Sequence, residues 1–432
     1  MKDERPVTLA WSGKNSTIGD RPSLAKAALK AQELEPAHTF ARGEIHRGDN
    51  LEILAALSEQ RPESVTLAYL DPPFLTGRLH AKIIKGESLD HRTTRVAFDD
   101  RWSDRAAYLQ ALGDRITETR KLLAPHGSIV VHVDTKTSHY VKVMMDEIFG
   151  DENRQGIICW RRRYNQPNDK TKMIAKVAEF IVAYARDARA LKASGVGKVD
   201  LTGAFANPDG DLRGDWASKP WKVGSDQSGS RYVITTPAGV TYDETWMGEE
   251  ETFHSLCADD RIVFPARGRG APRKKYFRKE REIEGQCATN WWHCDSFGHN
   301  QGANAQLTRL FGVKNVFSNP KPLELLRGLL QIGNLIEDDW VLDFFAGSGT
   351  TGHAVTAMNA EDGGRRRFIL VQAPAPVPEG APARALGLPT IPDILRERLR
   401  RAGADFRSLR FVPKGKTGSP GPASNPRGRH RP

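Results

Sequence analysis

The sequence predicts an α/β fold: a Rossmann-like, three-layer arrangement with a mostly parallel sheet between helices, interrupted by a long insertion. Strand-like and helix-like patterns alternate between residues 45 and 150, a rhythm typical of βαβ units. Two short tracts, Asp71-Pro72-Pro73-Phe74 and 343–351, each follow an apolar, strand-like run. Ligands of open parallel sheets bind beyond the carboxyl ends of the strands, so we expect both tracts at one edge of the sheet.

The individual elements follow from apolar spacing. A short helix is expected near residues 24–34, and apolar residues at helical intervals predict longer helices over 109–123 and 141–148. Gly150 is expected to end the last of these. Short runs rich in β-branched and aromatic residues predict strands at 128–133 and 179–185, and two more near Val341 and Phe368.

Composition divides the chain into five segments. The stretch from 161 to 320 is rich in Gly, Pro, Trp, Asn and basic residues and interrupts the sheet pattern, whereas the end of the chain has almost no apolar side chains. We therefore expect an N-terminal arm (1–40), two halves of one core (41–160 and 321–412) separated by an inserted region (161–320), and a disordered basic tail (413–432).

Length and charge limit the possible functions. A chain of 432 residues is expected to form one large or two smaller domains. Its net charge of +11 suits a protein that meets phosphate backbones, although a merely soluble basic protein would look the same. Four cysteines do not suggest a disulfide framework. With neither a membrane-spanning apolar run nor a signal-peptide pattern at the start, we expect a cytoplasmic protein.

The Asp71 tract is suited to a planar, amino-bearing group. A carboxylate can accept a hydrogen bond from an amine, the Pro72 carbonyl is held by the following proline ring and can accept a second, and Phe74 offers a face for stacking. Together these groups fit an exocyclic amine of a nucleobase turned out of its stack. The alternative is an ordinary turn at a strand end, since Asp-Pro is common in turns.

The downstream glycine-rich tract, 343–351, is not a nucleotide triphosphate loop of the Walker type, because lysine is missing before Thr350. Its small residues would let the backbone approach a nucleotide-like cofactor, and Asp343 would contact an ammonium group or hold the loop. A tight turn without a ligand is the alternative.

These two tracts, in this order, resemble the catalytic and cofactor motifs of the beta group of DNA amino-methyltransferases. Such enzymes methylate exocyclic amines of adenine or cytosine with S-adenosylmethionine. Within the group, the chain is similar to modification subunits of type III restriction systems. The resemblance spans most of the chain, and its further segments are Gly48 to Leu54, Asp99 to Trp102, Asn319 to Leu323 and Arg365 to Val371.

The resemblance implies roles for individual residues. It makes 41–160 the catalytic half of the core, 161–320 the target-recognition region and 321–412 the cofactor-binding half. Within the first of these, it makes Asp71, Pro72, Pro73 and Phe74 catalytic. It assigns cofactor binding to Asp49, Lys321, Asp343, Phe345, Ala346, Gly347, Ser348, Gly349, Thr350 and Gln372. Asp49 has a helix N-cap as its alternative role. Two positions depart from the family pattern: Phe344 replaces a usual proline, and Gln372 replaces a frequent acidic residue that holds the ribose hydroxyls, so cofactor affinity is the property in question.

Two basic stretches are candidate DNA contacts. Arg161, Arg162 and Arg163 precede Tyr164, and Arg273, Lys274 and Lys275 precede Tyr276 and Phe277. Positive charge beside aromatic rings suits contacts with a phosphate backbone, while a solvated loop is the alternative. We expect no metal site, because the spacing of Cys287, His293, Cys294 and His299 lacks a paired zinc signature.

The sequence thus predicts a site-specific DNA methyltransferase that makes N6-methyladenine. Asp71 favours adenine, because the N4-cytosine enzymes of this group often have serine there. N4 methylation of cytosine, an RNA substrate, and a recognition subunit with weak catalysis are the alternatives. The expected partners are double-stranded DNA, a restriction subunit and a second copy of the chain.

Overall fold

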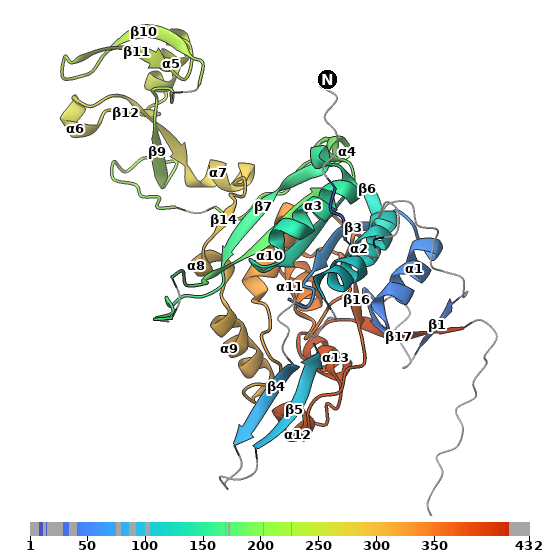
Figure 1. Ribbon diagram of the computed structural model, residues 1–432. Helices are drawn as coiled ribbons and strands as arrows, with labels where there is room; N and C mark the ends of the chain where they lie inside the picture. Colours follow the sequence, from blue (N-terminus) through green and yellow to red (C-terminus); the bar gives the residue numbers. More distant parts are fainter. Residues whose placement is uncertain are drawn as a thin grey trace, which may run out of the picture. The chain divides into compact units, whose positions relative to one another are not determined.

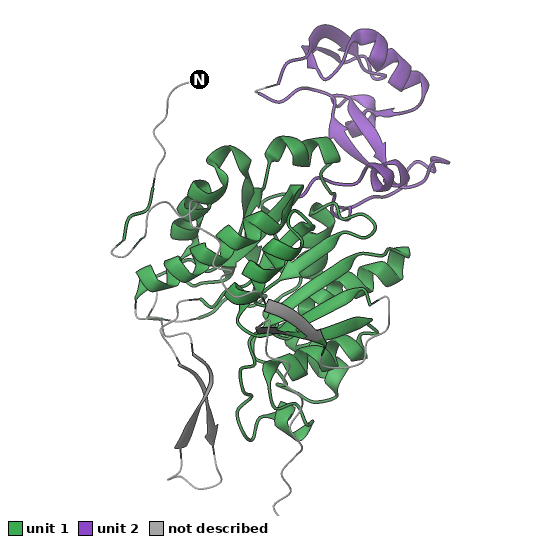
Figure 2. Ribbon diagram, turned by 90° about the vertical axis from the view of Figure 1, so that its right-hand side faces the viewer, with its two compact units in different colours: residues 1–197, 289–432 green, residues 198–288 purple. Residues whose placement is uncertain are grey.

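The structure is a computed structural model that describes residues 8–11, 14, 29–33, 41–74, 79–85, 92–99, 104–168, 170–171, 173–201, 203–225 and 227–413. Two compact units divide the chain (Figure 2). Unit 1 comprises Met1–Gly197 and Thr289–Pro432, and unit 2 is Lys198–Ala288. No helix among the described residues has the length and apolar character needed to cross a membrane.

A ten-stranded sheet runs through unit 1. Six neighbouring strands, from β17 to β6, are parallel, whereas β1 and β8 run antiparallel to their neighbours. The order across the sheet is β1 (Leu29–Glu33), β17 (Phe406–Pro413), β2 (Gly43–Arg47), β16 (Arg367–Gln372), β15 (Trp340–Asp343), β3 (Val65–Leu70), β6 (Leu123–Val133), β8 (Ala178–Ala185), β7 (Arg154–Arg161) and β14 (Trp291–Trp292).

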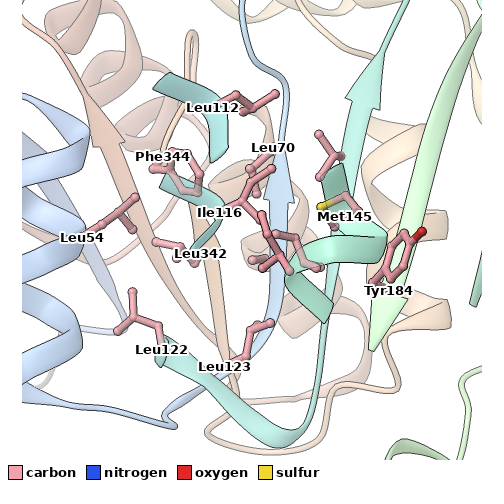
Figure 3. Close-up of a cluster of buried hydrophobic side chains, with 14 of the residues drawn as sticks. Leu54, Leu70, Leu112, Ile116, Leu122, Leu123, Met145, Tyr184, Leu342 and Phe344 are labelled. Carbon is pink, nitrogen blue, oxygen red and sulfur yellow. The ribbon is translucent and has the colours of Figure 1, made fainter. Parts of the chain in front are cut away.

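Helices cover both faces of this sheet (Figure 1). Side chains of α1, α2 and α3 share one buried cluster with Ile369 and Val371 of β16. Figure 3 shows part of this cluster, including Leu54, Leu112 and Met145 of the three helices. Successive strand residues point to opposite faces, and Leu370 indeed lies on the other side, where a Cβ on Gly352 of α11 would come within 2.9 Å of its Cδ1. The three-layer prediction is therefore confirmed.

The helices of unit 1 are α1 (Asn50–Gln60), α2 (Arg105–Leu122), α3 (Ser138–Phe149), α4 (Ala188–Ser194), α8 (Cys294–Phe297), α9 (Asn300–Phe311), α10 (Leu323–Ile332), α11 (Thr350–Asp362), α12 (Pro382–Ala385) and α13 (Ile391–Arg401), with a 3-10 turn at Asp151–Asn153. Strands β4 (Leu79–Lys85) and β5 (Arg92–Asp99) form a separate antiparallel pair.

Most elements predicted from periodicity are present. The helices expected over 109–123 and 141–148 are α2 and α3, and Gly150 ends α3 with a φ of 89° that favours glycine. The predicted strands lie within β6 and β8. Strand β3 is buried at every position, which explains its continuous apolar pattern rather than an alternating one.

Two expectations about boundaries differ from the structure. The short helix expected near 24–34 is wrong for its described part, because residues 29–33 form strand β1 and pair antiparallel with β17. The region expected to interrupt the core from 161 to 320 is wider than the separate unit, since β8 pairs with β6 and β7 inside the main sheet. The tail beyond Pro413 and the segment 100–103 lie outside the described residues.

Unit 2 has a small core of its own. Trp221, Ile234, Trp246, Phe253 and Ile262 are buried together. Its elements are β9 (Trp216–Pro220), β10 (Ser230–Thr235), β11 (Thr241–Trp246), α5 (Glu250–Ala258), β12 (Ile262–Val263), α6 (Pro265–Gly268), β13 (Arg273–Phe277) and α7 (Arg278–Glu284). Strands β12, β13 and β9 form one sheet, and β10 pairs with β11.

Candidate active site

The two motif-bearing tracts lie at the same edge of the sheet. Strands β3 and β15 are adjacent and parallel, with Leu342 opposite Ala68. Asp343 is the last residue of β15, and Asp71 directly follows β3. The carboxyl ends of both strands therefore meet, as the sequence predicted, and this edge is where ligands of parallel sheets bind.

The glycine turn after β15 is held by the buried carboxyl of Asp343. Oδ1 accepts a hydrogen bond from the Phe345 N–H at 3.0 Å, and Oδ2 accepts one from the Thr351 hydroxyl at 2.6 Å. Gly347 and Gly349 have φ values of 52° and 82°, which side-chain-bearing residues rarely adopt. Burial raises the pKa of Asp343 to about 7, despite these two hydrogen bonds.

Gln372, at the end of β16, also holds this turn. Its Oε1 accepts a hydrogen bond from the Gly347 N–H at 2.8 Å, and its Nε2 donates to the Ala373 carbonyl at 3.3 Å. The Ala346 N–H donates to the Val371 carbonyl at 3.3 Å. A neutral amide at position 372 therefore has a structural partner in the turn itself.

Arg398 of α13 also holds the glycine turn through hydrogen bonds, and the sequence analysis did not predict this role. Its Nη1 donates to the hydroxyls of Ser348 at 2.8 Å and Thr350 at 2.7 Å, and its Nε lies 3.4 Å from Nδ1 of His353. Arg398 is buried, and within the described part of the chain no carboxylate pairs with it. Burial lowers its pKa to about 9. No local motif marks it, because its partners are some fifty residues away.

Asp49 caps helix α1, the alternative role considered for it. Its Oδ1 accepts from the Leu51 N–H at 2.9 Å and the Glu52 N–H at 3.3 Å. The side chain is 55% exposed, with Oδ2 3.7 Å from Nη2 of Arg115. The neighbouring Asn50 donates from Nδ2 to the Phe344 carbonyl at 2.8 Å. Asp49 therefore lies beside the glycine turn with one oxygen not used in capping.

Asp71 forms an ion pair with Lys321. Its Oδ1 lies 2.8 Å from Lys321 Nζ, which also lies 4.9 Å from the centre of the Phe74 ring. Pro72 is buried, and Phe74 is half-buried, 5.9 Å from the His132 ring. The resemblance assigned Lys321 to cofactor binding, whereas these contacts are with Asp71 and Phe74 of the tract Asp71-Pro72-Pro73-Phe74, the catalytic tract.

A buried polar network continues behind Lys321. Glu179 Oε2 lies 3.9 Å from Lys321 Nζ and 2.9 Å from Nε2 of His132, while its Oε1 lies 3.2 Å from Nε of Arg162. His132 Nδ1 lies 3.2 Å from the Tyr69 hydroxyl. Burial alone would raise the pKa of Glu179, but Lys321, His132 and Arg162 lower it to about 2. No sequence pattern marks this network, because its members lie far apart in the sequence.

Only part of the first basic stretch, Arg161 to Arg163, is available for contacts with DNA. Arg162 pairs with Glu179, and Arg161 donates to Nε2 of His293 at 2.9 Å and to the Tyr164 carbonyl at 2.9 Å. Arg163 is exposed, and the neighbouring Tyr164 is 58% exposed. The predicted DNA contacts thus divide into structural arginines and one exposed arginine beside an exposed ring.

In the second stretch, Lys275 is not a surface residue. Only 1% of its side chain is exposed, and Nζ lies 2.6 Å from Asp209, 3.0 Å from Asp260 and 3.3 Å from Asp211. The Lys275 ammonium is therefore already paired with carboxylates inside unit 2, which does not fit the expected contact with DNA. Arg273, which donates to the Ser218 side chain and carbonyl, is partly exposed.

Lys274, the remaining member of that stretch, is also partly exposed.

The described residues contain two groups with the geometry of metal ligands. In one, Asp209, Asp211 and Asp260 surround the Lys275 ammonium, which lies within ion-pair distance of all three carboxylates. The other comprises the consecutive residues His293, Cys294 and Asp295, where His293 caps α8.

A family model described as DNA methylase matches residues 65–373. The chain is 32% identical to the Mod subunit of the type III restriction-modification enzyme StyLTI of Salmonella typhimurium, over 84% of this chain and 57% of that subunit. It is 27% identical to the type II methyltransferase M.KpnI of Klebsiella pneumoniae, covering 85% of this chain and 89% of that enzyme. It is 25% identical to the Escherichia coli EcoP15I Mod subunit, covering 94% and 70% respectively. The chain thus spans just over half the length of the StyLTI subunit.

Proposed function

This chain belongs to the DNA methylase family, and on that premise we propose that it transfers a methyl group from S-adenosylmethionine to N6 of adenine at a specific site in double-stranded DNA. The observation that carries the proposal is the meeting of the Asp71 tract and the glycine turn at one sheet edge. Bound S-adenosylmethionine supplies an electrophilic methyl group on a sulfonium centre.

Asp71 and Pro72 provide the acceptors for the target amine. The lone pair of an exocyclic amine is delocalised into the base, which makes the nitrogen a poor nucleophile. Asp71 accepts a hydrogen bond from one N–H of the amine, and the Pro72 carbonyl accepts a hydrogen bond from the other. The nitrogen then favours a pyramidal form whose lone pair is free to attack the methyl group of the cofactor. Phe74 and the adjacent Pro73 provide a surface against which a flipped base stacks.

The glycine turn fits the cofactor. Its backbone bends through Gly347 and Gly349, which carry no side chains of their own, and Phe345 adds an aromatic side chain beside it. We assign cofactor contacts to Phe345, Ala346, Gly347 and the half-exposed carboxylate of Asp49. Asp343, Ser348, Gly349, Thr350 and Gln372 shape the turn through the hydrogen bonds and dihedral angles described above.

We assign DNA reading to the region 161–320, and within it chiefly to unit 2. The sequence of unit 2 contains 14 Lys and Arg but 15 Asp and Glu, so the excess positive charge of the chain lies elsewhere. Specific contacts in unit 2 must then come from local groups such as Arg273 and Lys274. In unit 1, the loop after β7 carries Arg163 and Tyr164 at the catalytic edge, since β7 ends where β6 ends.

Adenine is preferred over cytosine because Asp71 stands where N4-cytosine enzymes of this group often have serine. We also propose a cytoplasmic setting and a restriction subunit as partner, by analogy with the type III Mod subunits among the relatives. A homodimer is the second partner proposed, and it is tested by the mass of the purified protein in solution.

Methyl transfer is tested by incubating the purified chain with labelled S-adenosylmethionine and DNA from a methylation-free host. The DNA is then hydrolysed and its nucleosides are separated by mass. Labelled N6-methyl-2′-deoxyadenosine supports the proposal, and labelled N4-methyl-2′-deoxycytidine moves the target to cytosine. Label in added RNA but not in DNA changes the substrate class. Cofactor binding without any transfer favours a recognition subunit.

A further inference from the structure

We propose that Lys321 is a positioning residue that orients the Asp71 carboxylate toward the target amine, and this inference rests on the proposed function. Lys321 Nζ lies 2.8 Å from Oδ1 of Asp71. Oδ1 itself is buried, whereas the Asp71 side chain as a whole is 24% exposed. The exposure therefore falls on the remaining atoms, and the ion pair leaves Oδ2 as the oxygen available to an incoming amine.

The position of Lys321 is well defined before any ligand arrives. It stands between Pro320 and Pro322, both buried, which restrict the backbone on either side. Only 11% of its side chain is exposed. Its ammonium also lies 4.9 Å from the centre of the Phe74 ring, within the range of a cation–π contact. Lys321 thus contacts two members of the catalytic tract at once.

Glu179 keeps this lysine charged in a buried setting. Burial acts to lower the pKa of Lys321, but Asp71 and Glu179 together raise it above its ordinary value. Glu179 is in turn held by His132 and Arg162. The carboxylates of Asp71 and Glu179 are therefore balanced by the cations of Lys321 and Arg162. Removing Lys321 alone leaves Asp71 without its ion-pair partner.

Among the described residues, the ion pairs of Lys321 are with Asp71 and Glu179 and its cation–π contact is with Phe74, and none of these partners belongs to the glycine turn. A cofactor role would predict that substitution weakens S-adenosylmethionine binding. A positioning role predicts slower transfer with unchanged cofactor binding, because a misdirected Oδ2 no longer meets the amine. These two outcomes separate the assignments.

The experiment compares Lys321→Met and Lys321→Arg with wild type, using DNA from a methylation-free host and labelled S-adenosylmethionine. For Lys321→Met we expect kcat to fall on the order of 10²-fold, as for other small misplacements of reacting groups. The dissociation constant of S-adenosylmethionine, measured by calorimetry, should change less than about twofold, a change of under ~0.5 kcal/mol. Lys321→Arg should recover at least a tenth of the wild-type kcat, since it keeps a cation beside Asp71.

The matched control is Lys142→Met on α3, which removes an ion pair with Asp146 far from the catalytic tract and should leave kcat unchanged. If Lys321→Met does not fold, Lys321→Met combined with Glu179→Gln keeps the local charge balanced and should show the same loss of kcat. Unchanged kcat in a variant that binds cofactor, equal losses for Met and Arg, or weakened cofactor binding with normal kcat would each overturn the inference. Absence of transfer by wild type would instead defeat the proposed function.

Discussion

Asp71 and Asp343 stand at the carboxyl ends of adjacent parallel strands, although one belongs to the first quarter of the chain and the other to the last. Only the sheet brings them together, since the intervening sequence includes unit 2 and several strands of unit 1. The two carboxylates have different surroundings and are assigned different roles. Asp343 is buried and fixes the glycine turn, whereas Asp71 keeps an exposed side and is the proposed acceptor for the amine.

Replacing Asp71 with alanine should abolish methyl transfer and leave cofactor binding largely intact. Loss of one preorganised acceptor is expected to cost at least ~10²-fold in kcat, and the glycine turn does not depend on Asp71. Transfer kinetics and calorimetry measure the two properties. Asp151→Ala, which removes exposed ion pairs with Lys142 and Arg154 in unit 1, is the matched control. Turnover of Asp71→Ala close to wild type would refute the assigned role.

Asp343 should make the stability of the protein depend on pH. Its pKa in the folded state is about 7, above the ordinary value of 3.8, so the folded state holds its proton more tightly than the unfolded state. The stabilising contribution is therefore complete below about pH 4 and is lost as the pH rises toward 7. The full difference is at most about 4 kcal/mol.

The comparison with Asp343→Asn isolates this effect. Asparagine keeps an acceptor for the Phe345 N–H but does not titrate. Wild-type unfolding free energy, measured by denaturant titration, should decline relative to the variant between pH 4 and 7 and stay level above that. A difference between the two proteins that is constant across this range would show that Asp343 is ionised throughout.

Arg398→Met should weaken cofactor binding without lowering overall stability. The guanidinium fixes the Ser348 and Thr350 hydroxyls, and a hydrogen bond from a charged donor contributes about 1.5–3 kcal/mol, so we expect a roughly tenfold or greater rise in the cofactor dissociation constant. Burial of a charge without a carboxylate is itself costly, so an apolar replacement should not lower Tm. Arg400→Met, on the exposed side of the same helix, is the control. Unchanged cofactor affinity would contradict this role of Arg398.

The basic run of β13 offers a test of DNA binding. Neutralising Arg273 and Lys274 together as glutamines should weaken binding to all DNA. The slope of log affinity against log salt should become less steep by about 0.9 for each phosphate that the protein no longer neutralises. Unchanged affinity and slope would move the backbone-binding site elsewhere, with Arg163 as the next candidate.

Lys275 should behave differently from its two neighbours. Alanine there leaves three carboxylates without their shared cation. The side chain of Asp211 is buried, but those of Asp209 and Asp260 are 38% and 75% exposed, so the loss of stability should be smaller than the cost of about 3–5 kcal/mol for breaking a fully buried pair. We expect unfolding of unit 2 at lower temperature, visible in the fluorescence of its tryptophans. A variant with wild-type stability and weaker DNA binding would restore the sequence-based assignment of Lys275.

Local patterns predicted the sheet edge well, because a strand followed by a turn motif is written in consecutive residues. Asp71, Asp343 and the glycine turn were found in this way. The residues that contact them were not predicted. Glu179, His132 and Arg398 are single polar residues, and their roles depend on contacts with strands and helices that are distant in the sequence.

The same limit applies where the structure differs from the expectations. Lys275 lies in a basic run, and only the fold shows that Asp209 and Asp211 fold back onto it. Residues 29–33 carry a helical pattern, yet pairing with β17 makes them a strand, since tertiary context overrides local propensity. The long insertion appeared to begin at 161, because β8 and its neighbours lack the regular βαβ rhythm although they belong to the main sheet.

The most direct test of the central claim is single-molecule sequencing of DNA from a methylation-free host that expresses the chain, beside a host that expresses Asp71→Ala. We expect N6-methyladenine within one short sequence context in the first host and none in the second. Methylated cytosine as the sole product would contradict the base assignment. Methylation that persists with Asp71→Ala would contradict the mechanism at the sheet edge.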